Sequence, residues 1–288
     1  MFSILEKHDI DYPGMNISFV PYGEGYISCV RQIHGRPAGA PMYPEVFNQT
    51  HILSLDTEFH IQDHYRLNED VDWGRQKHVS FCTGVEDARF ISSTQMICVA
   101  HGTNPHWVTK TAYFEFSHED RKITRFVPLC IEGKERDTEK NWLFLRQVDA
   151  THLHFLHWYN PFQIVEVDLD TGVGRIIRSY TKPGLELNCH GGAALFLEDR
   201  QQYLVNLRNI VNHRYTNNMW VLFDAEYEIC GMSAGFHFGQ EEAPGYQISM
   251  ALHVKEGRLY ASVCTDEKKM AIFVMDLEEV LSTIQPIV

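Results

Sequence analysis

The chain has 288 residues, of which 44% are hydrophobic and 22% are charged, proportions that are ordinary for a globular protein and exclude a disordered one. Its 38 acidic residues outnumber the 25 lysines and arginines, which gives a formal net charge of −13. Such a charge argues against nucleic acid or an anionic membrane as the main partner, and it says little about a neutral sugar.

The N-terminal stretch MFSILEKHDIDYPG lacks the basic leader, apolar core and cleavage site of a signal peptide. No apolar stretch reaches the ~20 residues that span a bilayer, so we expect no membrane span. The seven cysteines are scattered and form no CxxC pair, which argues against a zinc ribbon or a disulfide framework. We expect a cytoplasmic protein with reduced thiols and, since the 16 histidines show no spacing such as HExxH, no metal site.

Five strand-like stretches recur along the chain, each rich in Val, Ile, Phe or Tyr and bounded by Gly, Asn or Asp. In chain order they read GYISCVRQ from residue 25, QMICVAHG from 95, HLHFLHWY from 152, QYLVNLRN from 202 and RLYASVCT from 258. After a polar turn each is followed by a second strand: HILSLDTEF, TAYFEFSHED, FQIVEVDLDTG, MWVLFDAEYEI and AIFVMDLEEV. Each pair predicts a β-hairpin. Only DLEEVLSTI, near the end, has a short helical pattern.

Repeated hairpins of this kind are typical of β-propeller blades, which leave only short, protected sheet edges. Five hairpins predict an all-β protein, a single five-bladed β-propeller. No linker rich in Pro, Ser or Gly divides the chain, so we expect one domain over residues 1–288. A large β-sandwich is the alternative, but it would not explain the repeated pattern of two strands and an acidic turn.

The apolar stretch FCTGVEDARF (81–90) contains three charged residues where a plain core strand would have Val and Ile. Side chains alternate along a strand, so Asp87 and Arg89 are expected on one side and Glu86 and Ala88 on the other. Two interpretations are open. The charges are either an ion pair that fixes a strand end, or they hold Asp87 as an acid near the axial funnel.

The segment GVEDARF resembles the GxEDPR motif of glycoside hydrolase family 130, the β-mannoside phosphorylases and mannosidases, and is similar to glycosyltransferase family 108. Ala88 replaces the usual Pro of that motif. Other segments similar to these families follow in order through all five predicted blades: NISFVPYGEGYISCVR (16–31), EKNWLF (139–144), CHGGAALF (189–196) and LYASVCTDEKKMAIFVMDLEEV (259–280).

The resemblance implies a five-bladed propeller with its active site in the axial funnel, and an enzyme that makes or breaks β-mannosidic bonds. Asp87 would be the general acid, with the proton passing through a sugar hydroxyl. Arg31 and Arg89 would orient the sugar and the acid, and Asp266 would hydrogen-bond the sugar. Lys140 matches the lysine that contacts phosphate in family 130.

Further candidates come from neighbouring stretches. The stretch NLRNIVNHRY supplies Arg208, His213 and Arg214 as candidates for phosphate binding. His101 follows a predicted funnel strand and is a candidate for contacting the substrate. The Trp and Tyr residues of HFLHWYNPF are interpreted as propeller core, with a sugar-stacking platform as the alternative.

Cleavage by phosphate with inversion needs one protein acid, whereas hydrolysis needs a second carboxylate as base. No such base stands out, so the sequence favours inorganic phosphate or a sugar phosphate as a substrate, with no other cofactor. The expected partner is a mannose-containing oligosaccharide or polysaccharide. A β-mannoside hydrolase and a non-catalytic propeller that binds glycans or proteins remain the alternatives.

Overall fold

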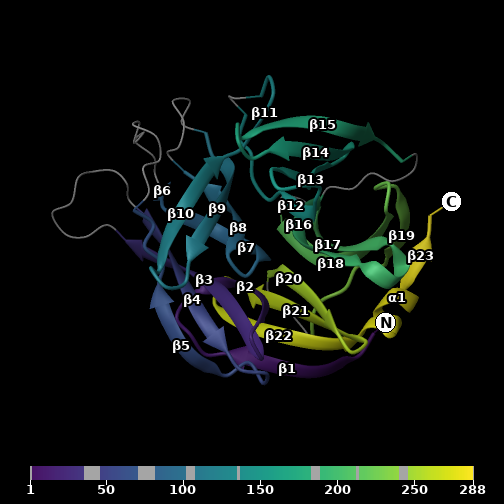
Figure 1. The fold of residues 1–288 in the computed structure, drawn as a ribbon. Helices are drawn as coiled ribbons and strands as arrows, with labels where there is room; N and C mark the ends of the chain where they lie inside the picture. Colours follow the sequence, from purple (N-terminus) through teal and green to yellow (C-terminus); the bar gives the residue numbers. More distant parts are fainter. Residues whose placement is uncertain are drawn as a thin grey trace.

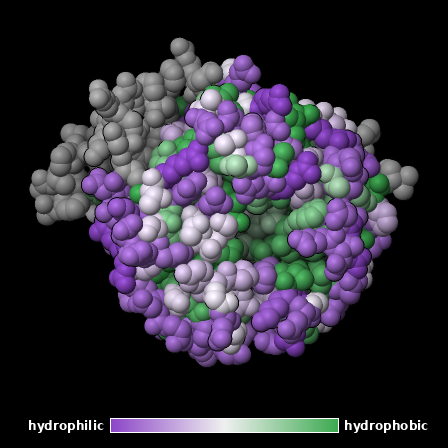
Figure 2. Space-filling model, viewed as in Figure 1, coloured by the Kyte–Doolittle hydropathy of each residue, from purple (hydrophilic) through white to green (hydrophobic). Residues whose placement is uncertain are grey.

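The computed structural model of the chain describes residues 2–35, 46–70, 82–101, 108–134, 137–182, 189–211, 214–239 and 246–287. These residues form five β-sheets arranged in a ring around a central axis (Figure 1). The fold is therefore an all-β, five-bladed β-propeller, which confirms the fold predicted from the repeated hairpins. In the space-filling view the ring is hollowed at its centre (Figure 2).

Each blade contains four main antiparallel strands, ordered from the axis outward. Blade one is β2 (Met15–Tyr22), β3 (Gly25–Gly35), β4 (Val46–Leu55) and β5 (Ile61–Arg66), and blade two is β7 (Val85–Ser92), β8 (Gln95–Ala100), β9 (Lys110–Ser117) and β10 (Lys122–Pro128). Blade three is β12 (Leu143–Gln147), β13 (His152–Tyr159), β14 (Phe162–Asp168) and β15 (Val173–Tyr180). Blade four is β16 (Cys189–Leu197), β17 (Gln202–Val211), β18 (Arg214–Asp224) and β19 (Ile229–Ser233). The short strands β6 (Cys82–Thr83) and β11 (Cys130–Ile131) extend blades one and three.

Blade five joins the two ends of the chain. It contains β20 (Gln247–Lys255), β21 (Arg258–Thr265) and β22 (Lys269–Asp276), and its outermost strand is β1 (Ile4–Ile10). The helix α1 (Leu277–Ser282) confirms the predicted helical pattern, and Asp276 caps it by accepting a hydrogen bond from the backbone N–H of Glu279. The last strand, β23 (Ile284–Pro286), then pairs with β19 in blade four. In the described segments no helix has the length and apolar character needed to span a membrane.

The predicted hairpins are the two middle strands of each blade, such as β3 with β4 and β13 with β14. Middle strands pack on both faces and are therefore rich in apolar residues. The innermost strands carry polar residues and glycines where they approach the axis, and an outer strand such as β15 is largely exposed. Their patterns are weaker for that reason, and most of them were not predicted.

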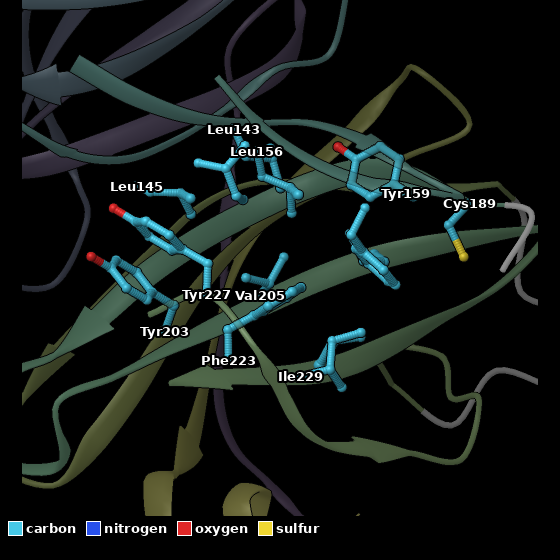
Figure 3. Packing of buried hydrophobic residues seen from close by; sticks show 14 of the residues in the cluster. Leu143, Leu145, Leu156, Tyr159, Cys189, Tyr203, Val205, Phe223, Tyr227 and Ile229 are labelled. Carbon is cyan, nitrogen blue, oxygen red and sulfur yellow. The ribbon is translucent and has the colours of Figure 1, made fainter. Parts of the chain in front are cut away.

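Apolar side chains between neighbouring blades form the core. Figure 3 shows the cluster between blades three and four, where Leu143 and Leu156 face Val205 and Phe223. Phe223 is 2% exposed, and its ring meets that of Phe162 edge to face at 5.6 Å. Contacts of this kind hold the blades at fixed positions around the axis.

We predict that Phe223→Ala lowers the free energy of unfolding by about 3–5 kcal/mol, because it leaves a cavity between two blades. Ile176→Ala is the matched control, since Ile176 is an apolar residue on β15 that is 37% exposed. The control should change stability by about 0.5 kcal/mol or less. Urea denaturation followed by circular dichroism measures both values. Equal losses in the two variants would show that the blade interface does not carry the stability.

Candidate active site

One end of the ring gathers the charged residues. In an antiparallel sheet the start of one strand lies beside the end of the next. Arg31, late in β3, lies opposite Met15 at the start of β2, and Arg208, late in β17, lies opposite His190 at the start of β16. Because every blade starts with its innermost strand, these positions lie at the same end of the propeller.

At this end, residues with a left-handed backbone recur at equivalent places in three blades. They are Asn16 (φ 57°), Asp87 (φ 52°) and Asn141 (φ 62°). Each is the second residue of a similar segment: MNISF (15–19), EDARF (86–90) and KNWLF (140–144). Asn and Asp are the residues other than Gly that adopt this conformation most readily. The repeat thus places a short polar side chain near the axis in each of these blades.

A β-bulge positions Asp87. The register of β7 against β8 shifts between Glu86 and Arg89, so Asp87 does not pair with β8. Its Oδ1 accepts hydrogen bonds from Asn16 Nδ2 at 2.6 Å and from Arg31 Nη1 at 3.0 Å. The side chain remains 16% exposed. Asp87 is therefore held by two donors from blade one and still open to a ligand.

Glu86 also contacts Arg31, so the predicted alternation of Glu86 and Asp87 on opposite sides of the strand is wrong. Arg31 Nη1 lies 3.4 Å from Glu86 Oε1, and His101 Nε2 lies 2.5 Å from Glu86 Oε2. The bulge explains this, because it breaks the period of two on which the prediction rested. Burial alone would raise the pKa of Glu86, but the hydrogen bond from His101 and the charges of Arg31 and Lys140 hold that pKa below its ordinary value.

Two further guanidinium groups are buried beside this pair of acids. Arg89 is 7% exposed and donates from Nη1 to the carbonyl oxygen of Trp142 at 3.3 Å. Arg208 is 3% exposed and donates to Tyr246 Oη at 2.6 Å and to the carbonyl oxygen of Gly191 at 3.0 Å. Burial, and then the charge of Arg208, lower the pKa of Arg89. The two cations are therefore close enough to repel each other.

A cavity of about 570 Å³ adjoins these groups, and its lining includes Lys140, Asn141, Tyr159 and His190. Sequence reasoning missed His190. Burial, followed by the charges of Arg208 and Lys140, lowers the pKa of His190 to about 4. A side chain at Gly191 would collide with Tyr159 Oη and the carbonyl oxygen of Asn141, which explains why a glycine follows His190.

A second missed residue is Glu139, which lines the same cavity and is 3% exposed. Its Oε2 accepts hydrogen bonds from His157 Nε2 at 2.7 Å and from Trp142 Nε1 at 3.1 Å. His157 is 6% exposed. A buried carboxylate needs such partners. The EKNWLF segment itself does not show that Glu139 is paired, because its partner His157 comes from β13.

The remaining predicted site residues are less directly connected. Asp266 is exposed in the turn between β21 and β22, where its Oδ1 accepts from the backbone N–H of Tyr246 at 2.9 Å. Tyr246 links it to Arg208, because Arg208 Nη1 donates to Tyr246 Oη. His213 lies outside the described residues, and Arg214 begins β18 with a side chain that is not described. His101 contacts Glu86, and its role toward a substrate stays a prediction.

No protein-family model matches the sequence, and no curated protein is similar to it in sequence. Solved structures share its fold. A β-1,2-mannobiose phosphorylase from Listeria innocua, in complex with β-1,2-mannobiose, has a TM-score of 0.65 at 11% identity over 96% of this chain and 92% of that chain.

A second structure is described under glycoside hydrolase family 130, a family of mannoside phosphorylases that contains glycoside hydrolases targeting β-1,2-mannosidic linkages in Candida mannan. It has a TM-score of 0.59 at 12% identity over 91% of this chain and 84% of that chain. An exo-β-1,3-galactanase from Phanerochaete chrysosporium, solved with galactose, has a TM-score of 0.55 at 10% identity over 96% of this chain and 63% of that chain. At these identities the likeness establishes the fold alone. The proteins that share this fold are described with different sugars, so the fold by itself does not identify a substrate.

We predict that the imidazole of His190 stays neutral down to about pH 5, because its pKa is lowered to about 4 while an ordinary histidine titrates near about 6.5. NMR titration of the ring protons measures this directly. His152 is the control, since its hydrogen bond with Asp149 raises its pKa. Lys140→Met should move the His190 midpoint upward by removing one nearby charge. A His190 midpoint near that of a free histidine would contradict this account of the site.

Proposed function

We propose that the protein is an inverting carbohydrate-active enzyme that makes or breaks β-mannosidic bonds with phosphate or a phosphorylated sugar donor. The observation that carries this proposal is the geometry of Asp87, the residue that matches the acid of the family 130 motif. A left-handed bulge presents it between Asn16 and Arg31, at the end of the ring where cations gather. The fold shared with a β-1,2-mannobiose phosphorylase supports the same conclusion.

In the cleavage direction, an oxygen of phosphate attacks the anomeric carbon on the face opposite the leaving sugar. The bond between that carbon and the glycosidic oxygen breaks, and the proton that this oxygen needs comes from Asp87 through a sugar hydroxyl. In the synthetic direction Asp87 takes the proton back. One protein acid is sufficient, because phosphate itself is the nucleophile.

The distribution of charge favours an anionic substrate. The protein as a whole carries a formal charge of −13, yet three cations lie close together at this end of the ring. The charge of Arg208 lowers the pKa of Arg89, and the charges of Arg208 and Lys140 both lower the pKa of His190. Like charges in a partly dehydrated site repel, and a bound oxyanion relieves that repulsion. Guanidinium groups also match the geometry of phosphate oxygens. Neutral His190 can hydrogen-bond an oxyanion as well.

The neighbouring carboxylates do not favour water as the nucleophile. Both oxygens of Glu86 are engaged, one by Arg31 and one by His101. The oxygens of Glu86 and Asp87 that contact Arg31 lie within 3.4 Å of one nitrogen atom. That places them closer together than the about 6.5–9.5 Å that inverting hydrolases use between acid and base. Glu139 is engaged by His157 and Trp142.

We predict that Asp87→Asn lowers turnover of β-mannosides by about 10²-fold or more, the usual contribution of a general acid. Folding should survive, because Asn tolerates the left-handed backbone at this position. Asp170→Asn is the matched control, the same chemical change at a carboxylate that is 70% exposed. Steady-state kinetics and thermal unfolding measure the two effects separately. Unchanged turnover in Asp87→Asn would remove the mechanism.

We predict that cleavage depends on phosphate and releases a sugar 1-phosphate. Lys140→Ala should raise the KM for phosphate by about tenfold or more, the effect of losing one charge-assisted contact. Lys122→Ala, at an exposed lysine on β10, is the control. Anion-exchange chromatography of the products identifies the sugar phosphate. Free mannose formed without phosphate would instead favour a hydrolase.

A further inference from the structure

Two adjoining cavities lie over blade three beside the candidate site. The first, of about 570 Å³, contains Lys140, Asn141 and His190. The second, of about 470 Å³, is lined by residues that include Pro161 and Gln163. Four residues line both cavities: Thr138, Glu139, His157 and Trp158. The hollow that begins at the candidate site therefore continues outward along blade three, and each part has the volume of a small-molecule site.

Trp158 stands between the two cavities with its side chain open to solvent. It is 53% exposed, whereas Phe155 and Tyr159 on the same strand are 0% and 7% exposed. The interpretation of the Trp and Tyr residues of this stretch as core is therefore correct for Tyr159 and wrong for Trp158. The reason is that Trp158 follows a register shift in the pairing of β13 with β14. An exposed indole at the rim of a cavity indicates a binding surface.

The orientation of the indole is fixed. Its Nε1 donates to the carbonyl oxygen of Asn160 at 3.1 Å. The neighbouring ring of His157 lies 5.9 Å away, centroid to centroid, at an interplanar angle of 35°. His157 is held in turn by Glu139 and by Gln163, whose Oε1 lies 3.1 Å from Nδ1. The aromatic face is therefore preorganised, which reduces the entropy cost of binding a ligand to it.

Lys134, Asp137 and Glu139, which also contribute to the lining of the second cavity, are held by hydrogen bonds. Lys110 is 3% exposed, and its ammonium group donates to the carbonyl oxygens of Lys134 at 3.1 Å and Asp137 at 2.7 Å. The backbone N–H of Glu139 donates to the carbonyl oxygen of Thr109 at 2.8 Å. The cavity thus combines an aromatic face with polar groups, and a sugar ring presents apolar faces and hydroxyl groups that match both.

We propose that Trp158 divides two successive sugar-binding subsites, so that the substrate is a mannose-containing chain of at least three sugars. The sugar whose bond is broken lies at Asp87, with phosphate on the side of Lys140 and His190. The next sugar occupies the part of the first cavity beside Trp158 and Asn160, away from these cations, and a third sugar occupies the second cavity. The chain then extends outward over blade three. This inference rests on the proposed function. It adds the minimum length of the substrate, and it assigns the recognition of that length to Trp158.

Calorimetry on the Asp87→Asn enzyme tests the inference, because this variant binds substrate without cleaving it. The ligands are β-1,2- and β-1,4-linked mannosides of two, three and four sugars. We expect the trisaccharide of the preferred linkage to bind about tenfold or more tightly than the disaccharide. Adding Trp158→Ala should reduce this gain to about threefold or less, whereas Trp158→Phe should keep most of it, since it retains an aromatic face.

Tyr22→Ala is the matched control, because Tyr22 is an exposed aromatic residue, 46% exposed, that lines neither cavity. It should leave the gain unchanged. Equal affinities for two and three sugars, or a gain that survives Trp158→Ala, would overturn the subsite proposal while the proposed function stands. If no mannoside binds to Asp87→Asn and none is cleaved by the unaltered enzyme, the proposed function fails as well.

Discussion

The guanidinium of Arg31 is the group on which the candidate site depends. It joins blade one to blade two by contacting two adjacent carboxylates, Glu86 and Asp87, through one nitrogen atom. Two acids side by side in a partly buried place would repel each other without such a partner. The arrangement separates the roles of the acids. Glu86 is held at both oxygens, by Arg31 and His101, whereas Asn16 and Arg31 both donate to Oδ1 of Asp87, which stays open to a ligand. A one-residue bulge makes this possible.

The site also reverses the overall charge of the protein. Cations that come from four different blades lie at this end of the ring, whereas the formal charge of the whole chain is strongly negative. A strongly negative net charge repels other polyanions, and under the proposed function the local cations favour a small anion such as phosphate. The charge of Lys140 is felt at two residues, because it lowers the pKa of Glu86 and the pKa of His190.

Sequence reasoning predicted the five blades because the middle strands are apolar on both faces and repeat. It singled out Asp87 as a candidate acid through a motif, and that role stays a prediction. It assigned Glu86 to the wrong side of the strand, since alternation fails at a bulge. His190 and Glu139 were missed because the groups that define them, such as Arg208 and His157, are distant in sequence. Trp158 shows the same limit, as apolar runs do not reveal which aromatic residue a register shift turns outward. Contacts between side chains of different blades can be identified only in the folded ring.

The pairing of β1 with β22 has a consequence for biosynthesis. Ile4 lies opposite Met275, so β1 finds its partner strand only after all the intervening blades have been made. Contacts between residues so far apart in sequence form slowly. Until then the nascent chain exposes the edge of an unpaired strand, which is a liability for aggregation. The ring is therefore closed only after β22 has been made, and only from that point on do the five blades together surround the funnel.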